Sequence, residues 1–368
     1  MAKGGGLKAE PLTPARDLIA SAEPERILVV CLRYLGDSLL LRPALRALRN
    51  RFPHAQIDVV VAAGTAIALQ GDQNATSVGE WPRAFGSVLV EACRIRRCRY
   101  DWLVDFTGND RSAFVSLASG ARWRITYDRP RFAEWTLRRA AYNVRIRHRK
   151  KKPHTIIQRL ELLEACGVPA CGTEVDLVPD VEARNWAEAQ LGGLPRPILA
   201  AHLTSRDMQK AIPVSSAASV LREFIAAGGS VILTSGSAAT EREHVATAVA
   251  GLPSNRVRTF SDATFQQLAA LLAAADFYWG ADTAPSHIAS ALGRTMLVEF
   301  GPSRASHWYP LGEAAEFVEH PCSCQAAKSN TCRKAVPARC LVEAGPGAAL
   351  DWLRRVTVQR GPAGDRGG

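Results

Sequence analysis

The feature that most constrains the fold is an alternation of apolar, strand-like runs with helical segments, which occurs twice along the chain. In the first instance, residues 27–32 are continuously apolar, residues 39–52 carry apolar side chains at helical spacing, and residues 57–61 are apolar again except for Asp58. Continuous apolar runs of this length are typical of parallel strands that are covered on both faces. The alternation restarts at residues 198–202. The sequence therefore predicts an α/β chain with two Rossmann-like domains facing one another across a cleft.

The domain boundaries are predicted where this alternation breaks. A Gly-Gly-Leu-Pro-Arg-Pro segment at residues 192–197 marks the change from an N-terminal domain, residues 25–180, to a C-terminal domain, residues 195–355. Residues 1–24 are expected to be a flexible lead-in and residues 361–368 a disordered tail. No apolar run approaches the roughly 18 to 20 residues that span a bilayer, and the start of the chain lacks the apolar block of a signal peptide, so we expect a cytoplasmic protein.

The stretch at residues 280–303 predicts a strand, a tight loop, a short helix and a second strand. Asp282 and Thr283 stand where an N-cap is expected, and Pro285 fits a first helical turn. A helix N-terminus at the carboxyl end of a parallel strand favours anions, because its free N–H groups and its dipole both attract negative charge. Two interpretations remain open here, a phosphate or nucleotide contact and a helix that Asp282 and Thr283 merely cap.

Asp37 follows the first strand, where the first helix is predicted to begin. The turn contains one glycine, Gly36, so it is not the G-x-G-x-x-G fingerprint of a dinucleotide site. Asp37 is either an N-cap, which this position favours, or a carboxylate that serves as a general base.

The net charge of +11 is concentrated in residues 122–159, which hold thirteen lysines and arginines. A patch of this kind favours a polyanion, and nucleic acid, an anionic membrane surface and a phosphorylated acceptor fit its charge equally well. The chain lacks a recognised nucleic-acid motif and a regular spacing of aromatic residues in this region, which argues against nucleic acid as a partner.

Four of the nine cysteines form a cluster with the spacing C-x-C-x7-C-x7-C: Cys322, Cys324, Cys332 and Cys340. Four thiolates suit a tetrahedral zinc site, but structural zinc sites usually show C-x2-C pairs. Free thiols are therefore favoured, and zinc at these four cysteines is the alternative. We expect no cofactor.

Two segments together resemble a known family. The Arg33–Asp37 turn with Phe52 and Pro53, and the Gly280–His287 loop with residues 300–303, are similar to the heptosyltransferases of glycosyltransferase family 9. The resemblance runs from about residue 26 to residue 352. It implies the GT-B architecture and transfer of a sugar from a nucleotide sugar, typically ADP-heptose, onto the inner core of lipopolysaccharide with inversion at the anomeric carbon.

The resemblance also implies a role for individual residues. Asp37 is the implied base for the acceptor hydroxyl, and Glu241, with Glu243 as an alternative, is the implied partner of a ribose hydroxyl. The donor diphosphate is expected to contact Lys210, Arg206, Asp282, Thr283, Ala284, Pro285 and His287. The chain departs from the family pattern at Ala284, where many members have Gly, and at Ile212, where many have Trp. The acceptor is expected to contact Arg122, Arg124, Arg145, Arg147 and His154, although these residues also fit a charged face without a specific ligand.

The sequence is thus interpreted as a metal-independent, inverting glycosyltransferase that moves a heptose or related sugar from an ADP-sugar to a lipopolysaccharide core or similar glycan. Its expected partners are the nucleotide sugar and an anionic, lipid-linked acceptor at the inner face of the cytoplasmic membrane. The alternative is a non-catalytic nucleotide- or polyanion-binding protein that retains the fold.

Overall fold

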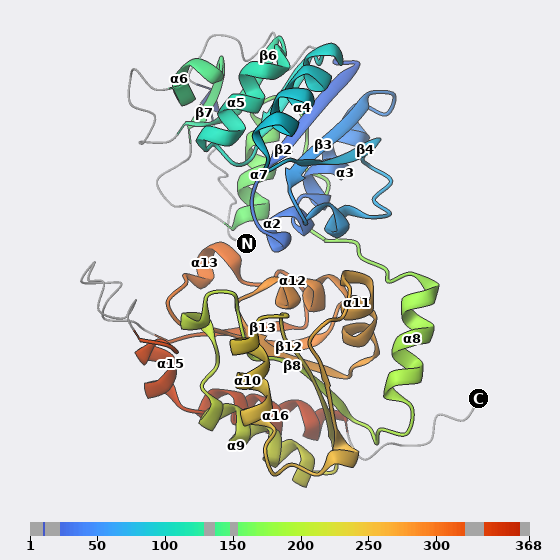
Figure 1. Cartoon of the computed structure of the whole chain (residues 1–368), viewed down its shortest axis with the longest axis vertical. Coiled ribbons are helices and arrows are strands. Elements are labelled where there is room, and N and C mark those ends of the chain that lie inside the picture. Colours follow the sequence, from blue (N-terminus) through green and yellow to red (C-terminus); the bar gives the residue numbers. More distant parts are fainter. Residues whose placement is uncertain (1–9, 12–22, 129–136, 148–153, 321–334, 361–368) are drawn as a thin grey trace, which may run out of the picture. The chain divides into compact units, whose positions relative to one another are not determined.

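The structure is a computed structural model that describes residues 10–11, 23–128, 137–147, 154–320 and 335–360. The chain divides into two compact units, Met1–Val175 (unit 1) and Asp176–Gly368 (unit 2). Each unit is built on one sheet (Figure 1).

The sheet of unit 1 has the strand order β1-β7-β6-β5-β2-β3-β4. All neighbouring strands are parallel except the edge strand β1, which pairs antiparallel with β7 and interrupts the predicted flexible lead-in. The strands are β1 (Glu10–Pro11), β2 (Arg26–Cys31), β3 (Gln56–Ala62), β4 (Ser77–Trp81), β5 (Trp102–Asp105), β6 (Trp123–Asp128) and β7 (Val144–Arg147).

Helices cover both faces of this sheet (Figure 1). Leu28 and Val30 of β2 pack with apolar residues of α4 and α5, whereas α3 and α7 pack together over the opposite face. The helices are α2 (Leu35–Leu39), α3 (Arg42–Arg51), the short 3-10 helix η1 (Ala66–Leu69), α4 (Phe85–Arg97), α5 (Asp110–Ser119), α6 (Leu137–Ala141) and α7 (Thr155–Glu164).

The sheet of unit 2 is entirely parallel and has the order β10-β9-β8-β11-β12-β13. Its central strands are buried along their whole length, as the apolar runs predict. The strands are β8 (Ile198–His202), β9 (Ser230–Thr234), β10 (Val257–Phe260), β11 (Phe277–Ala281), β12 (Thr295–Phe300) and β13 (Ala315–Glu319).

One core of unit 2 lies between the sheet and the helices α9, α10 and α16, and the helices α8, α11 and α12 pack with one another. The helices are α8 (Val181–Leu191), η2 (Met208–Lys210), α9 (Val214–Ala226), α10 (Ala239–Ala248), η3 (Ser254–Arg256), α11 (Phe265–Ala274), α12 (Ala284–Ala291), α13 (Ala305–Trp308), α15 (Arg339–Ala344) and α16 (Gly347–Arg360). No helix within the described ranges is long and apolar enough to cross a membrane.

The first predicted helix differs from the structure. Residues 39–52 do not form one helix, because α2 ends at Leu39 and a second helix, α3, starts at Arg42. Pro43 lies in the first turn of α3, where its missing N–H costs nothing, whereas inside a longer helix it would break a hydrogen bond. The chain therefore turns twice between β2 and β3.

The C-terminal helix α16 completes the core of unit 2. Trp352 is 1% exposed and packs edge to face against Phe277, with the ring centroids 6.3 Å apart. Phe277 in turn packs edge to face against Phe224 of α9 at 6.3 Å. The three rings join α16, the sheet and α9 into one apolar layer.

Replacing Trp352 with Ala is expected to lower the free energy of unfolding by about 3–5 kcal/mol, because it removes a buried ring and leaves a cavity. Urea denaturation followed by circular dichroism measures the change. The control is Val358→Ala on the same helix, whose side chain is 79% exposed; it should change stability by no more than about 0.5 kcal/mol. Equal stability of the two variants would contradict the packing of α16.

Candidate functional site

Asp37 lies just past the carboxyl end of β2, in the first turn of the short helix α2. The N-cap of α2 is Tyr34, and its side chain makes no capping hydrogen bond. The capping interpretation of Asp37 is therefore wrong, because a cap residue precedes the helix and Asp37 is its third residue. The Asp37 side chain is nearly buried.

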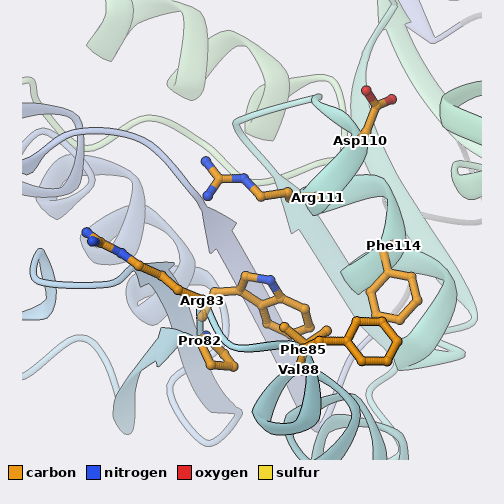
Figure 2. A pocket seen from close by; sticks show the side chains of 8 residues that line it. Pro82, Arg83, Phe85, Val88, Asp110, Arg111 and Phe114 are labelled. Atoms are coloured by element: carbon orange, nitrogen blue, oxygen red, sulfur yellow. The ribbon is translucent and has the colours of Figure 1, made fainter.

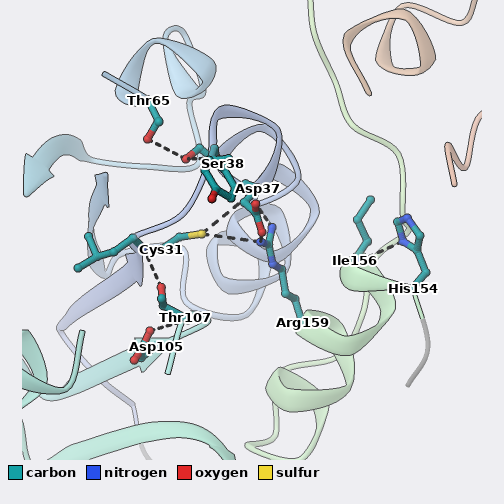
Figure 3. A network of polar contacts seen from close by, with 11 residues as sticks. Cys31, Asp37, Ser38, Thr65, Asp105, Thr107, His154, Ile156 and Arg159 are labelled. Carbon is teal, nitrogen blue, oxygen red and sulfur yellow. Dashed lines mark hydrogen bonds and ion pairs between the residues drawn. The ribbon is translucent and has the colours of Figure 1, made fainter. Parts of the chain in front are cut away.

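Arg159, on α7, reaches Asp37 across 122 residues of sequence (Figure 3). Its Nη1 donates a hydrogen bond of 2.8 Å to the backbone carbonyl of Asp37, and its Nη2 lies 3.6 Å from Asp37 Oδ1. The guanidinium carbon is 5.7 Å from the centroid of the Phe106 ring, a cation–π distance. Both charged side chains are buried, so this is a buried ion pair at the carboxyl edge of the sheet.

The thiol of Cys31 lies beside this ion pair. Cys31 Sγ lies 3.7 Å from Arg159 Nη2 and 4.0 Å from the backbone carbonyl of Asp37. Burial raises the pKa of Cys31 to about 12, so it is a neutral thiol near pH 7. Cys31 therefore packs against the ion pair without adding charge to it.

The loop after β5 is held against the end of β2. The N–H of Leu32 donates to Thr107 Oγ1 at 2.7 Å. The fully buried carboxylate of Asp105 accepts hydrogen bonds from the N–H groups of Thr107 and Gly108 at 2.6 and 3.1 Å, and from the hydroxyl of Tyr142. Buried polar groups that are satisfied in this way rigidify the loop, and with it the chain that leads into α2.

In unit 2, Lys210 is the only lysine of the chain that falls in the described ranges. It ends η2, in the segment that follows β8. Its Nζ lies 2.8 Å from Asp282 Oδ2 and donates a second hydrogen bond, of 3.3 Å, to the backbone carbonyl of Asp282. Asp282 follows β11, the strand beside β8, so the pair joins the carboxyl ends of two adjacent strands. The lysine side chain remains 28% exposed.

Glu241, in the first turn of α10, is nearly buried at the same edge. Its Oε2 accepts hydrogen bonds from the Thr204 hydroxyl at 2.8 Å and from the Gly236 N–H at 3.1 Å. A Cβ on Gly236 would lie 2.4 Å from Glu241 Oε1, so the carboxylate can approach the backbone only because this residue is glycine. Glu243 is exposed, and the structure thus brings only Glu241 to this edge.

The first turn of α12 leaves backbone N–H groups available. The side chain of Thr283, its N-cap, makes no capping bond and instead donates to the Ala281 carbonyl at 3.4 Å. Asp282 pairs with Lys210, so the interpretation that these two residues merely cap the helix is wrong. Within the described residues, the N–H groups of Thr283 and Ala284 have no hydrogen-bond partner, whereas Pro285 has no N–H to donate.

The imidazole of His287, also on α12, is buried, with its ring centroid 6.5 Å from that of Trp308. Arg206, on the segment between β8 and η2, is exposed. Lys210, Asp282, Glu241 and the α12 turn therefore lie at the ends of adjacent strands, with Arg206 on the same segment as Lys210.

Two participants in this cluster were not predicted from the sequence, Thr204 and Gly236. Thr204 lies two residues after β8, and Gly236 lies two residues after β9. A position just after a parallel strand is therefore the sequence signal that could have identified Thr204 and Gly236. Arg159 belongs to the basic region of residues 122–159, but nothing in the sequence indicates that it contacts Asp37.

The arginines expected to hold the acceptor do not converge. Trp123 and Trp102 are level with Ile27, near the start of β2, so the adjacent Arg122 and Arg124 lie at the amino edge of the sheet. Arg122 stacks over Trp123 at 5.6 Å, and Arg124 donates to the Ala141 carbonyl at 2.8 Å. These contacts hold the start of β6, at the edge opposite to Asp37.

Arg145 and Arg147 lie on β7, and Arg147 is exposed at its carboxyl end. His154 is buried and caps α7, because its Nδ1 accepts from the Ile156 N–H at 3.2 Å. Of the five residues expected to bind the acceptor, Arg147 alone combines exposure with a place at the carboxyl edge.

An apolar pocket of about 420 Å³ opens between β4 and the start of α4 and α5 (Figure 2). Phe85 is 77% exposed at its mouth, and Asp110 is held by a bidentate pair with Arg138 at 2.5 and 2.7 Å. The pocket is lined by Trp81, Pro82, Arg83, Phe85, Val88, Asp110, Arg111 and Phe114. Aromatic walls with two arginines suit a ligand that has both an apolar part and an anionic part.

Three of the four clustered cysteines, Cys322, Cys324 and Cys332, lie outside the described residues. Cys340 is buried at the start of α15 beside Leu341. Among the residues that the structure describes, no group of three or more His, Cys, Asp and Glu side chains forms a metal site.

The chain is similar to known proteins both in sequence and in fold. Residues 92–336 match the model of a family described as glycosyltransferase family 9 (heptosyltransferase). The curated protein lipopolysaccharide heptosyltransferase 3 of Escherichia coli is 24% identical over 348 residues, covering 88% of this chain and 97% of the relative.

Solved structures share the fold. ADP-heptose lipopolysaccharide heptosyltransferase II of E. coli matches with a TM-score of 0.73 at 19% identity, over 92% of this chain and 100% of that chain. The E. coli heptosyltransferase WaaC with ADP matches with a TM-score of 0.61 at 22% identity, over 82% and 98% of the two chains. The predicted α/β fold of GT-B architecture, with two Rossmann-like domains, is confirmed.

The buried His202 makes stability depend on pH. Its Nδ1 lies 2.8 Å from Thr234 Oγ1, and burial lowers its pKa to about 4. The unfolded chain, with a pKa of about 6.5 at this histidine, binds the proton more readily, so stability is lost as the pH falls from about 6.5 towards 4. Between pH 7 and pH 5, the free energy of unfolding of wild type should fall by about 2 kcal/mol more than that of His202→Gln.

Urea unfolding at the two pH values measures this difference. The exposed His54 provides the control, because His54→Gln should keep the pH dependence of the wild type. An identical loss in wild type and His202→Gln would show that His202 does not stay neutral in the fold.

Proposed function

The chain belongs to glycosyltransferase family 9, the heptosyltransferases, and from this premise we propose that it transfers a heptose or related sugar from an ADP-sugar to a lipopolysaccharide core or similar glycan. The transfer inverts the anomeric carbon. The acceptor oxygen bonds to that carbon as the bond from carbon to the diphosphate oxygen breaks, the acceptor proton is taken by a base, and the negative charge stays on the diphosphate.

The observation that carries this proposal is the cluster of Lys210 and the first turn of α12. Lys210, whose side chain is 28% exposed, and two N–H groups without partners among the described residues, those of Thr283 and Ala284, lie at the carboxyl ends of adjacent strands. A leaving diphosphate needs positive partners for its developing charge, and these groups supply them without a metal ion in the proposed reaction. Arg206, exposed on the same segment as Lys210, adds a second cation.

Glu241 supports a nucleoside diphosphate as the donor, in preference to a simple phosphate ester. Its Oε2 is occupied by Thr204 and Gly236, whereas Oε1 makes no hydrogen bond within the described chain. A fixed carboxylate oxygen suits a pair of ribose hydroxyls, which donate hydrogen bonds. The adenine part of the donor is proposed because a heptosyltransferase of this fold, WaaC of E. coli, has been solved with ADP.

Asp37 is the proposed general base. It is a carboxylate in a first helical turn, nearly buried, with its Oδ1 beside Arg159. Oδ2 makes no hydrogen bond to another described residue and is the oxygen that accepts the acceptor proton. A carboxylate suffices as the base where proton transfer accompanies late bond formation.

We propose that the acceptor is anionic and lipid-linked, and that the protein works peripherally at the inner face of the cytoplasmic membrane. The supporting features in unit 1 are the exposed Arg147, the pocket with Arg83 and Arg111, and exposed apolar residues on α4. Apolar side chains interleaved with arginines suit an anionic lipid surface. The amino-edge residues Arg122 and Arg124 are left out of the proposed acceptor contacts.

The proposal is tested with a calorimetric panel of nucleotide sugars, ADP-heptose included, and a transfer assay on heptose-free lipopolysaccharide core. We expect a clear preference for an ADP-sugar and transfer that Asp37→Asn reduces by about 10²- to 10⁴-fold. Donor affinity should be unchanged in that variant. Wild-type binding without turnover would favour the alternative of a non-catalytic nucleotide-binding protein, and a variant within a few-fold of wild type would refute the role of Asp37.

Lys210→Ala should weaken donor binding by about 10- to 100-fold, which corresponds to a charged hydrogen bond of about 1.5–3 kcal/mol. The matched control is Arg258→Ala on β10, which removes the same charge from unit 2 but whose side chain contacts the carbonyls of Ser254 and Val257. Calorimetry of both variants separates a specific contact from the net charge. Equal donor affinity of the two variants would contradict a phosphate contact at Lys210.

A further inference from the structure

We propose that Arg159 is a positioning residue for Asp37, fixing the carboxylate of the base in the orientation that receives the acceptor proton. This inference rests on the proposed glycosyl transfer. Arg159 is buried. In the proposed role it contacts neither the acceptor nor the donor and acts only through Asp37.

The geometry shows how one guanidinium controls both parts of Asp37 (Figure 3). Nη1 holds the backbone carbonyl at 2.8 Å, and Nη2 lies 3.6 Å from Oδ1. The first contact fixes the helical turn, and the second directs the carboxylate. Because Oδ1 faces the guanidinium, Oδ2 is the oxygen left for the acceptor hydroxyl.

The helix that carries Asp37 needs such support. α2 has five residues, a length at which an isolated helix is unstable, and no side chain caps its N-terminus. Ser38 Oγ bonds Thr65 Oγ1 at 3.0 Å on one side, and Arg159 from α7 holds the other. A catalytic carboxylate on a helix this short keeps its position only through contacts from outside the helix.

The surrounding charges single out Asp37 as the counter-ion of Arg159. An arginine is always protonated, so its charge must be compensated where it is buried. The other nearby carboxylate, Asp105, already accepts hydrogen bonds from Thr107, Gly108 and Tyr142. Cys31 stays neutral, and thus Asp37 is the acid that meets the guanidinium.

The chain offers a close structural counterpart, the Arg42–Asp72 pair. Arg42 is 7% exposed, lies 3.8 Å from Asp72 and donates to the backbone carbonyls of Ala68 and Gln70. Both arginines are buried, both pair with an aspartate and both hold backbone carbonyls of unit 1. Only Arg159 contacts the proposed base, so the two residues separate a general effect of losing a buried arginine from an effect on Asp37.

The experiment measures kcat and KM for transfer in wild type, Arg159→Met, Arg159→Lys and the control Arg42→Met, and repeats the two Arg159 changes in an Asp37→Asn background. We expect Arg159→Met to lower kcat by about 10- to 100-fold, with the donor KM within two-fold of wild type. Arg159→Lys keeps a cation and should recover part of the lost kcat. Arg42→Met should leave kcat within about three-fold, since the contacts of Arg42 are with Asp72 and with the carbonyls of Ala68 and Gln70.

The decisive result is the double-variant cycle. If Arg159 acts through Asp37, replacing it in the Asp37→Asn background should cause no further loss of the residual transfer. Equal losses in the two backgrounds would overturn the inference, as would an Arg159→Met variant as active as Arg42→Met.

Thermal unfolding is measured for every variant. If Arg159→Met does not fold, the same cycle is measured with Arg159→Lys. A wild type that transfers no sugar would contradict the proposed function itself and the inference with it, whereas transfer with an additive cycle contradicts the inference alone.

Discussion

Parallel strand pairing is the constraint on which the rest of this structure depends. Parallel neighbours must be joined by crossovers, so all strands of a sheet end at one edge and the residues that follow them meet there. In unit 1 this brings Asp37, after β2, beside the loop after β5. In unit 2 it brings Lys210, after β8, onto Asp282, after β11. The polar chemistry of each unit is thus assembled by its sheet, from residues far apart in sequence.

The same constraint explains which parts of the fold were predictable from the sequence. The buried strands β2, β3 and β8 consist mostly of apolar residues and were predicted nearly to their ends. The strands β6, β7 and β10 were missed, because polar and charged residues interrupt their apolar residues. An arginine-rich strand such as Val144–Arg147 looks like part of a charged surface until its pairing with β6 is known.

Side-chain roles were harder to predict than positions. Asp37 was placed correctly after the first strand, but whether it caps a helix depends on where α2 begins, a matter of two or three residues. Glu241 and Glu243 are two residues apart on one helix and therefore point in different directions, which only the structure of α10 resolves. The basic region proved to contain residues with different tasks: Arg124 holds backbone carbonyls at the amino edge, and Arg159 enters the interior. A count of charges cannot separate these tasks, because burial and partners are tertiary properties.

The Lys210–Asp282 pair has a consequence for the anion selectivity of the proposed donor site. Because the ammonium already has a carboxylate at 2.8 Å, an incoming anion must compete with an internal counter-ion before it gains the lysine. A singly charged anion from the cell gains little by that exchange, whereas a diphosphate brings more charge and additional oxygens for the neighbouring N–H groups. In a protein with a net charge of +11, this internal competition would favour the proposed diphosphate over small, singly charged anions.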